Sequence, residues 1–139
     1  MLGNVNDGVS LAARLFLATL FLIFGWRKVR DYSGTVDQMV RDGVPAPALA
    51  AAGAIFMELP VAFAVAVGGL TRASALLMVI YTLATSLVEH RYWSMNGADK
   101  LTNLEQFYKN LSISGGFLLL FVAGPGKYSI DVLCGLAAP

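Results

Sequence analysis

The chain has 139 residues, of which 57% are hydrophobic and 14% are charged, and its formal net charge is +1. Water-soluble domains carry about 25% charged residues, so this composition predicts a membrane protein. The balanced charge excludes a strongly basic nucleic-acid-binding protein. One cysteine, Cys134, and one histidine, His90, exclude an internal disulfide and make a poor zinc or haem site within this chain.

Four apolar segments predict an all-α, four-helix transmembrane bundle that forms a single domain over residues 1–139. In chain order, the expected helices cover residues 9–26, 47–70, 73–90 and 104–123. Each approaches or reaches the roughly 17 to 25 residues that a membrane helix needs. A soluble bundle would need a polar stripe on every helix, and residues 15–25 and 73–88 have none.

A short interfacial helix is expected between the first two membrane helices. The first helix ends in "WRKVR" (26–30), where one tryptophan and three bases are typical of an interfacial anchor. In "DYSGTVDQMVR" (31–41), apolar residues share one face of a short helix that would lie on the membrane surface. Pro47 then fits the first turn of the second membrane helix.

The third and fourth membrane helices are expected to be joined by a polar loop over residues 94–101. Thr102 and Glu105 have the spacing of a capping box, which predicts the start of the fourth helix. Basic residues gather in the loops after the first and third helices, while the opposite side carries only Arg72 and Lys127. Because basic loops stay in the cytoplasm, both termini are predicted to be periplasmic.

Glu58 is the most unusual residue of the second apolar segment, because it places a carboxylate about 15 Å deep along the helix. Pro60 follows it and would remove a backbone hydrogen bond and bend the helix beside the carboxylate. Two interpretations stay open. Glu58 pairs with another helix and holds the bundle together, or it accepts a proton or binds a ligand.

Arg14 in the first helix is the first candidate partner for Glu58, and the Lys109–Asn110 pair is the second. The depths of Arg14 and Glu58 would differ by about 7 Å, which an arginine side chain can largely span. Their side chains lean apart, however, because helical side chains point toward their own N-terminus. Arg14 could instead extend to the outer interface, and Glu58 could simply be protonated.

A second polar group lies where the third helix ends and the fourth begins. Glu89 and His90 would come close to Glu105, Lys109 and Asn110, because a short connection makes the two helices antiparallel neighbours. Each residue alone has an ordinary interfacial role, but together with deeper hydroxyls they could line a polar pocket. The predicted ligand-binding or polar core residues are Arg14, Glu58, Tyr81, Ser86, His90, Lys109 and Asn110.

Several motifs resemble those of the DoxX family of small bacterial membrane proteins. They are "RLFLATLFLIFGWRKV", "GAIFMELPVAF", "GLTRASALLM", "TSLVEHRYW" and "FYKNLSISGGFLLLFVAGPGKYSID", and together they cover about residues 14–131. The resemblance implies a four-helix protein of the bacterial inner membrane. It also implies a relation to the DoxD and DoxA subunits of thiosulfate:quinone oxidoreductase and to a membrane protein of methylamine dehydrogenase maturation. By motif position, Asp131 joins the polar residues already named.

Three function hypotheses follow, and the sequence does not choose between them. The first is an accessory membrane subunit that binds a quinone or docks a soluble or membrane oxidoreductase, with no intrinsic cofactor. The second is a carrier for a small molecule or lipid, which would act as a homo-oligomer because four short helices make a thin scaffold. The third is a structural assembly protein among the membrane lipids, held together by small residues and polar pairs.

Overall fold

The computed structural model describes residues 2–138, and these residues form helices joined by short turns. The long helices are α1 (Leu2–Arg30), α5 (Thr71–Glu89) and α6 (Gly97–Ala123). The remaining elements are α2 (Tyr32–Arg41), α3 (Pro47–Phe56), the π-helical turn η1 (Met57–Val61), α4 (Ala62–Val67), the 3-10 turn η2 (Tyr92–Ser94) and α7 (Ile130–Leu133). The all-α prediction and the short helix after α1 are confirmed.

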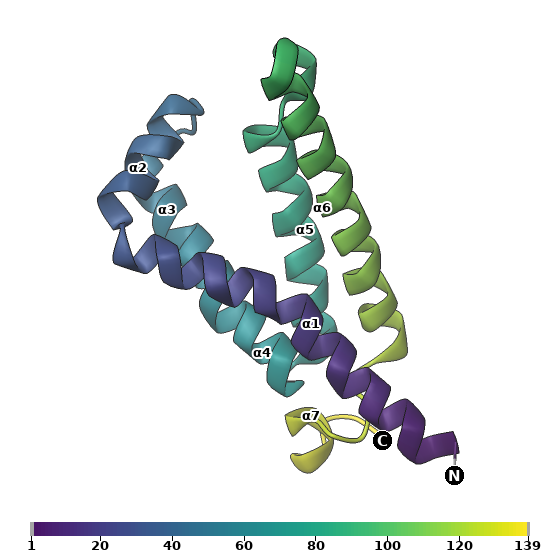
Figure 1. Cartoon of the computed structure of the whole chain (residues 1–139). Helices are drawn as coiled ribbons and strands as arrows, with labels where there is room; N and C mark the ends of the chain where they lie inside the picture. Colours follow the sequence, from purple (N-terminus) through teal and green to yellow (C-terminus); the bar gives the residue numbers. More distant parts are fainter. Residues whose placement is uncertain (1, 139) are drawn as a thin grey trace.

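Two groups of helices meet along α1 (Figure 1). Helices α5 and α6 lie side by side as an antiparallel pair, while α3, η1 and α4 follow one another without a break and pack against α1. Helix α2 turns back over α3 at one end of the molecule. The two chain ends and α7 lie at the other end (Figure 1).

Within residues 2–138, three helical stretches are long and apolar enough to cross a membrane: Asn6–Arg30, Pro47–Val67 and Thr71–Ser94. Helix α6 is long enough, but its first half carries charged side chains such as Asp99, Lys100 and Glu105. The predicted bundle of four membrane helices is therefore not confirmed, because only three of the described stretches have the length and composition of a membrane span.

Several helix boundaries differ from the sequence prediction. Helix α1 continues to Arg30, four residues past the expected end, because the three bases of its last turn favour the negative end of the helix dipole. Helix α6 begins at Gly97, so the predicted start at the Thr102–Glu105 capping box is wrong. The start of α2 is capped by Asp31, whose carboxylate accepts a hydrogen bond from the Gly34 amide at 3.1 Å.

A buried apolar layer crosses the middle of the molecule. It brings together Phe21 of α1, Val65 of α4, Met78 of α5 and Phe117 of α6, with five further members: Val61, Ala62, Ala75, Val79 and Leu120. A smaller cluster joins Met39 of α2 to Ala51 and Ala54 of α3. By helix register, the large layer separates a polar centre around Glu58 from another around Arg14.

Candidate functional site

The carboxylate of Glu58 is buried and accepts hydrogen bonds from two neighbouring helices. Lys28 of α1 donates from Nζ to both carboxylate oxygens at 2.7 Å, and the Tyr81 hydroxyl of α5 donates to Oε1 at 2.6 Å. The Glu58 side chain is 7% exposed and that of Lys28 is 21% exposed. A charge at this depth is costly unless it is paired and hydrogen-bonded, and both conditions are met.

A glycine on α1 allows this helix to approach η1 closely. Gly25 lies three residues before Lys28 and therefore on the same helix face. A Cβ at Gly25 would come within 2.8 Å of the Glu58 Cβ and 2.9 Å of the Leu59 Cγ. The missing side chain lets α1 approach η1, so that Lys28 reaches the carboxylate.

The backbone around Glu58 departs from the regular α-helix. Residues Met57–Val61 form a π-helical turn that contains Pro60. Proline has no N–H to donate and disturbs the preceding turn, and single π-turns of this kind are frequent at functional sites. The sequence predicts that Pro60 disturbs the helix beside Glu58, and the structure has a π-turn there inside an otherwise continuous helix.

An interhelical cavity of about 390 Å³ opens beside the Glu58 carboxylate. Its walls come from α1, η1, α5 and α6. They combine apolar rings with polar groups: Phe21, Phe24, Lys28, Glu58, Tyr81, Glu89, His90, Asn103, Gln106, Lys109 and Asn110 are among the lining residues. The structure thus brings five of the seven predicted site residues to one cavity: Glu58, Tyr81, His90, Lys109 and Asn110.

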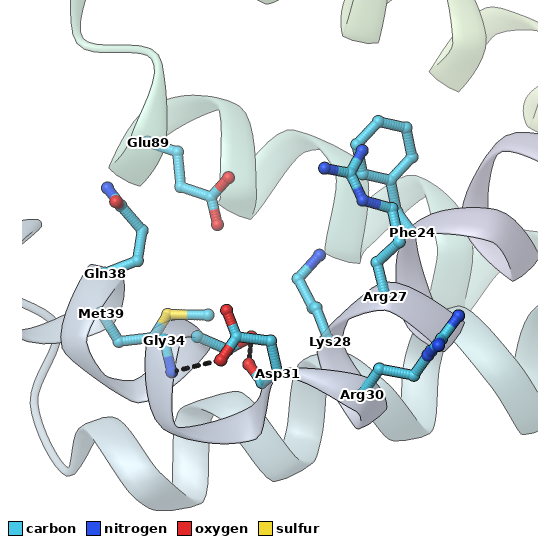
Figure 2. A pocket seen from close by; sticks show the side chains of 10 residues that line it. Phe24, Arg27, Lys28, Arg30, Asp31, Gly34, Gln38, Met39 and Glu89 are labelled. Carbon is cyan, nitrogen blue, oxygen red and sulfur yellow. Dashed lines mark hydrogen bonds between the residues drawn. The ribbon is translucent and has the colours of Figure 1, made fainter.

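A second cavity, of about 500 Å³, adjoins the corner between α1 and α2. Figure 2 shows Glu89 of α5 and Lys28 of α1 pointing into it from opposite sides, with Asp31, Gln38 and Met39 along one edge. Phe24, Lys28 and Glu89 line both cavities. The two spaces therefore share a wall.

The polar residues around the first cavity hold one another in place. His90 Nδ1 lies 3.0 Å from Asn103 Oδ1, and the Lys109 ammonium donates to Gln106 Oε1. Ser86 differs from the five predicted residues that line this cavity. Its hydroxyl donates to the Thr82 carbonyl at 2.8 Å, within its own helix, and the cavity walls do not include it.

The predicted ion pair between Arg14 and Glu58 is wrong, and so is the fallback to Lys109 and Asn110. Arg14 is fully buried near the middle of α1, about four turns before Lys28, where it donates to the carbonyls of Ala66 (3.0 Å) and Tyr128. The two residues do not pair because helical side chains point toward the N-terminus of their own helix, which directs Arg14 and Glu58 away from each other.

Arg14 belongs to a separate polar centre that fastens the C-terminal segment. Asp131 accepts hydrogen bonds from the Leu70 and Thr71 amides at 2.6 and 2.7 Å, which caps α5. Burial by itself would raise the pKa of Asp131. The hydrogen bonds from the start of α5 and the positive charge of Arg14 outweigh it, so the pKa lies below its ordinary value.

Lys28 is the residue of the candidate site that the sequence interpretation missed, because "WRKVR" was treated as a surface anchor. The direction in which helical side chains point could have identified Lys28. Lys28, near the end of α1, leans back into the bundle, and Glu58 leans toward the α2 side, so the two groups converge. Gly25, one turn earlier on the same face, is the second available signal.

Comparisons with known proteins identify relatives over nearly the whole chain. The DoxX family model matches residues 9–91, and the SURF4 family model matches residues 54–133. Inner membrane protein YphA of Escherichia coli (strain K12) is 44% identical over 129 residues, which cover 93% of this chain and 92% of the relative. Inner membrane protein YqjF of the same organism is 42% identical over 130 residues, covering 94% and 95%.

A more distant relative is the Surfeit locus protein 4 homolog of Drosophila melanogaster. It is 28% identical over 125 residues, which cover 88% of this chain but 40% of the relative. No solved structure matches the chain significantly.

Proposed function

Because the chain belongs to the DoxX family and is an integral inner-membrane protein, we propose that it is an accessory membrane subunit that binds a quinone head group for an oxidoreductase. The observation that carries the proposal is the cavity of about 390 Å³ beside Glu58, where aromatic walls meet hydrogen-bond donors from several helices. Ligand sites generally combine an apolar lining with a few convergent polar groups.

The chemistry of the lining suits a quinone. A quinone head group is a flat ring with a carbonyl acceptor at each of two opposite edges. On one side of the cavity, the Lys28 ammonium has a third N–H beyond the two that it donates to Glu58, and Asn110 provides an amide on α6. Phe21 and Phe24 supply ring faces and edges against which a flat ring can pack.

The electrons would come from outside this chain. Its single cysteine, Cys134, is exposed beyond α7, at the opposite end of the molecule from the cavity. We therefore infer a soluble or membrane oxidoreductase that docks on the α2 side and carries its own redox centre. The chain's part is to hold the quinone head group, exclude bulk water and keep hydrogen-bond donors in place.

We further propose that α6 is a fourth membrane helix and that both termini are periplasmic. The second half of α6, from Leu111 to Ala123, is apolar apart from two serines, Ser112 and Ser114. Four spans return the chain to the side on which it began. The basic residues after α1 and after α5 then both face the cytoplasm, in keeping with the positive-inside rule.

The carrier hypothesis is less well supported by the packing. A carrier must open its binding site to each side of the membrane in turn. The apolar layer around Phe21, Met78 and Phe117 closes the Glu58 cavity toward the opposite side. A homo-oligomer that carries a solute would need a route around this layer.

Quinone binding to the purified protein in lipid nanodiscs tests the proposal. We expect a short-chain quinone to bind at one per chain. Tyr81→Phe, which removes only the hydroxyl that holds the Glu58 carboxylate in the cavity wall, should weaken binding by about tenfold, the equivalent of about 1.4 kcal/mol. Tyr128→Phe is the matched control, because Tyr128 is exposed at the other end of the molecule. Absence of saturable binding, or equal loss in both variants, would overturn the proposal.

A further inference from the structure

Glu89 occupies a position that the proposed quinone site does not explain. Its side chain is partly buried where the two cavities meet. Within residues 2–138, no hydrogen bond or ion pair involves its carboxylate. The neighbouring Glu58, by contrast, has three close donor contacts.

The charged groups around Glu89 come from several elements. Lys28 faces it from α1, Asp42 lies at the end of α2, Glu58 lies on η1, and His90 is its neighbour in sequence. Figure 2 shows the Glu89 carboxylate and the Lys28 ammonium pointing into the same space. Glu89 is therefore held near a positive charge without being bonded to it.

The second cavity is suited to water. At about 500 Å³ it has room for several molecules, and its lining includes Arg30, Asp31, Thr35 and Gln38 as polar partners. A buried water needs two to four such partners. The second cavity reaches the corner between α1 and α2, where the helices leave the proposed membrane region. The Glu58 cavity, by contrast, is closed by the apolar layer on the side that faces Arg14.

We propose that the second cavity is a water-filled access route through which protons reach Glu58, and that Glu89 is the residue that takes them up. A hydronium ion in this cavity transfers its proton to the Glu89 carboxylate and leaves a water molecule. The protonated Glu89 then passes the proton through water in the adjoining cavity to the Glu58 carboxylate and returns to its ionised form. The positive charge of Lys28, which lies near both residues, limits the electrostatic cost of two nearby carboxylates.

The purpose of this route rests on the proposed quinone function, because reduction of a quinone to a quinol consumes two protons with two electrons. The partner oxidoreductase supplies the electrons, and the access route supplies the protons. The tests below use no quinone. Failure of the route and failure of quinone binding are therefore distinguishable.

The first test measures how fast Glu58 gains a proton. Rapid-mixing infrared spectroscopy of the protein in nanodiscs follows the carbonyl band of a protonated carboxyl group after a downward pH step. Loss of the band in Glu58→Gln assigns it. We expect Glu89→Gln to slow its appearance at least about tenfold. Glu105→Gln, the removal of an exposed carboxylate on α6 that lines neither cavity, should leave the rate unchanged.

A second variant keeps the test decisive if Glu89→Gln does not fold. Thr35→Trp fills the second cavity and leaves every carboxylate in place, so it should slow proton uptake as well. A rate in either folded variant equal to that of the unmodified protein would overturn the proposal.

The side from which protons arrive is tested with membrane vesicles of both orientations. A hydrophobic carbodiimide modifies protonated carboxyl groups, and peptide mass spectrometry identifies the modified residue. With a pH difference held across the membrane, labelling of Glu58 should follow the pH on the α2 side. Labelling that follows the pH on the side of α7 would overturn the route.

Discussion

At the scale of single residues, the side chains of Lys28 and Glu58 differ in solvent exposure. This difference predicts which of the two residues is more costly to remove. Lys28 is 21% exposed and can rehydrate its ammonium, whereas the 7% exposed Glu58 carboxylate cannot. Loss of the lysine should therefore cost more than loss of the carboxylate. Removal of one member of a buried pair generally costs about 3 to 5 kcal/mol.

Lys28→Met should lower the unfolding free energy in detergent by roughly 3 kcal/mol, because it leaves the buried Glu58 carboxyl group with only the Tyr81 hydroxyl as a partner. The double change Lys28→Met with Glu58→Gln should lose less than Lys28→Met alone. Thermal unfolding of both singles and the double measures this coupling. Lys127→Met, at an exposed lysine near the C-terminus, is the control, and strictly additive losses would contradict the pairing.

Gly25→Ala should destabilise the protein by about 1 to 3 kcal/mol, the usual cost of overpacking. The added methyl group would meet the Glu58 Cβ at 2.8 Å and force α1 away from η1. Gly115→Ala is the matched control on α6, because a Cβ there meets nothing within 4 Å. It should stabilise its helix by up to about 1 kcal/mol. Equal effects of the two changes in thermal unfolding would show that Gly25 is not a close-contact position.

At the scale of elements, the C-terminal segment acts as the cap of α5. Leu70 precedes this helix with φ +46°, a left-handed conformation that is unfavourable for leucine. The Asp131 carboxylate binds the Leu70 and Thr71 amides, and the Asp131 amide in turn donates to the Gly68 carbonyl at 2.9 Å. The turn between α4 and α5 is thus held by residues more than 50 positions away along the chain.

The lowered pKa of Asp131 makes this cap sensitive to acid. A carboxyl whose folded pKa lies below its unfolded value of about 3.9 stabilises the fold above that pH, and the contribution is lost as the pH falls through the folded pKa. The melting temperature of the unmodified protein should therefore exceed that of Asp131→Asn at neutral pH, and the difference should shrink below about pH 4. A difference that is constant from neutral to acid pH would show that the charge of Asp131 is not what stabilises the cap.

The elements themselves were largely predictable, whereas the contacts between them were less so. Apolar run lengths and Pro47 located the helices, and the apolar spacing around Met39 located α2. The bounds of α6 could not be derived locally, since Thr102–Glu105 has a capping pattern that the continuing helix overrides. The cap of α5 comes from Asp131, a distant residue, and no local pattern near Thr71 could reveal it.

The same distinction applies to the candidate site. Glu58, Tyr81 and His90 were recognised because polar groups are rare in apolar segments. The Glu58 partner was misassigned because Arg14 is also an isolated charge in an apolar run, while Lys28 stands among bases that have an ordinary interfacial explanation. The depth of Lys28 in the membrane and the direction in which its side chain leans together favour it as the partner of Glu58. The π-turn at Pro60 and the tilt of α1, which bring the two groups together, depend on packing between helices.

At the scale of the whole molecule, the number of membrane spans and the positions of the basic residues predict the membrane topology. With α6 as a fourth span, a reporter fused after Pro139 should be active only in the periplasm, because the basic residues after α1 and after α5 favour the cytoplasm. Paired reporters, one active in each compartment, measure this. Activity confined to the cytoplasm would contradict the four-span orientation, and a reporter inserted in the loop after α2 should show the opposite pattern.

Helix α1 is fixed to the helices beside it at two heights. Arg14 holds the end of α4 and Lys28 holds η1, and their separation of 14 positions in the sequence corresponds to about 21 Å of helix. A helix fastened at one point can change its tilt to suit a thin or thick bilayer, but one fastened at two points cannot do so without breaking a buried polar contact. The lipids around this protein must therefore stretch or compress to match it. Its stability should consequently pass through a maximum as the acyl chains of the surrounding bilayer are lengthened.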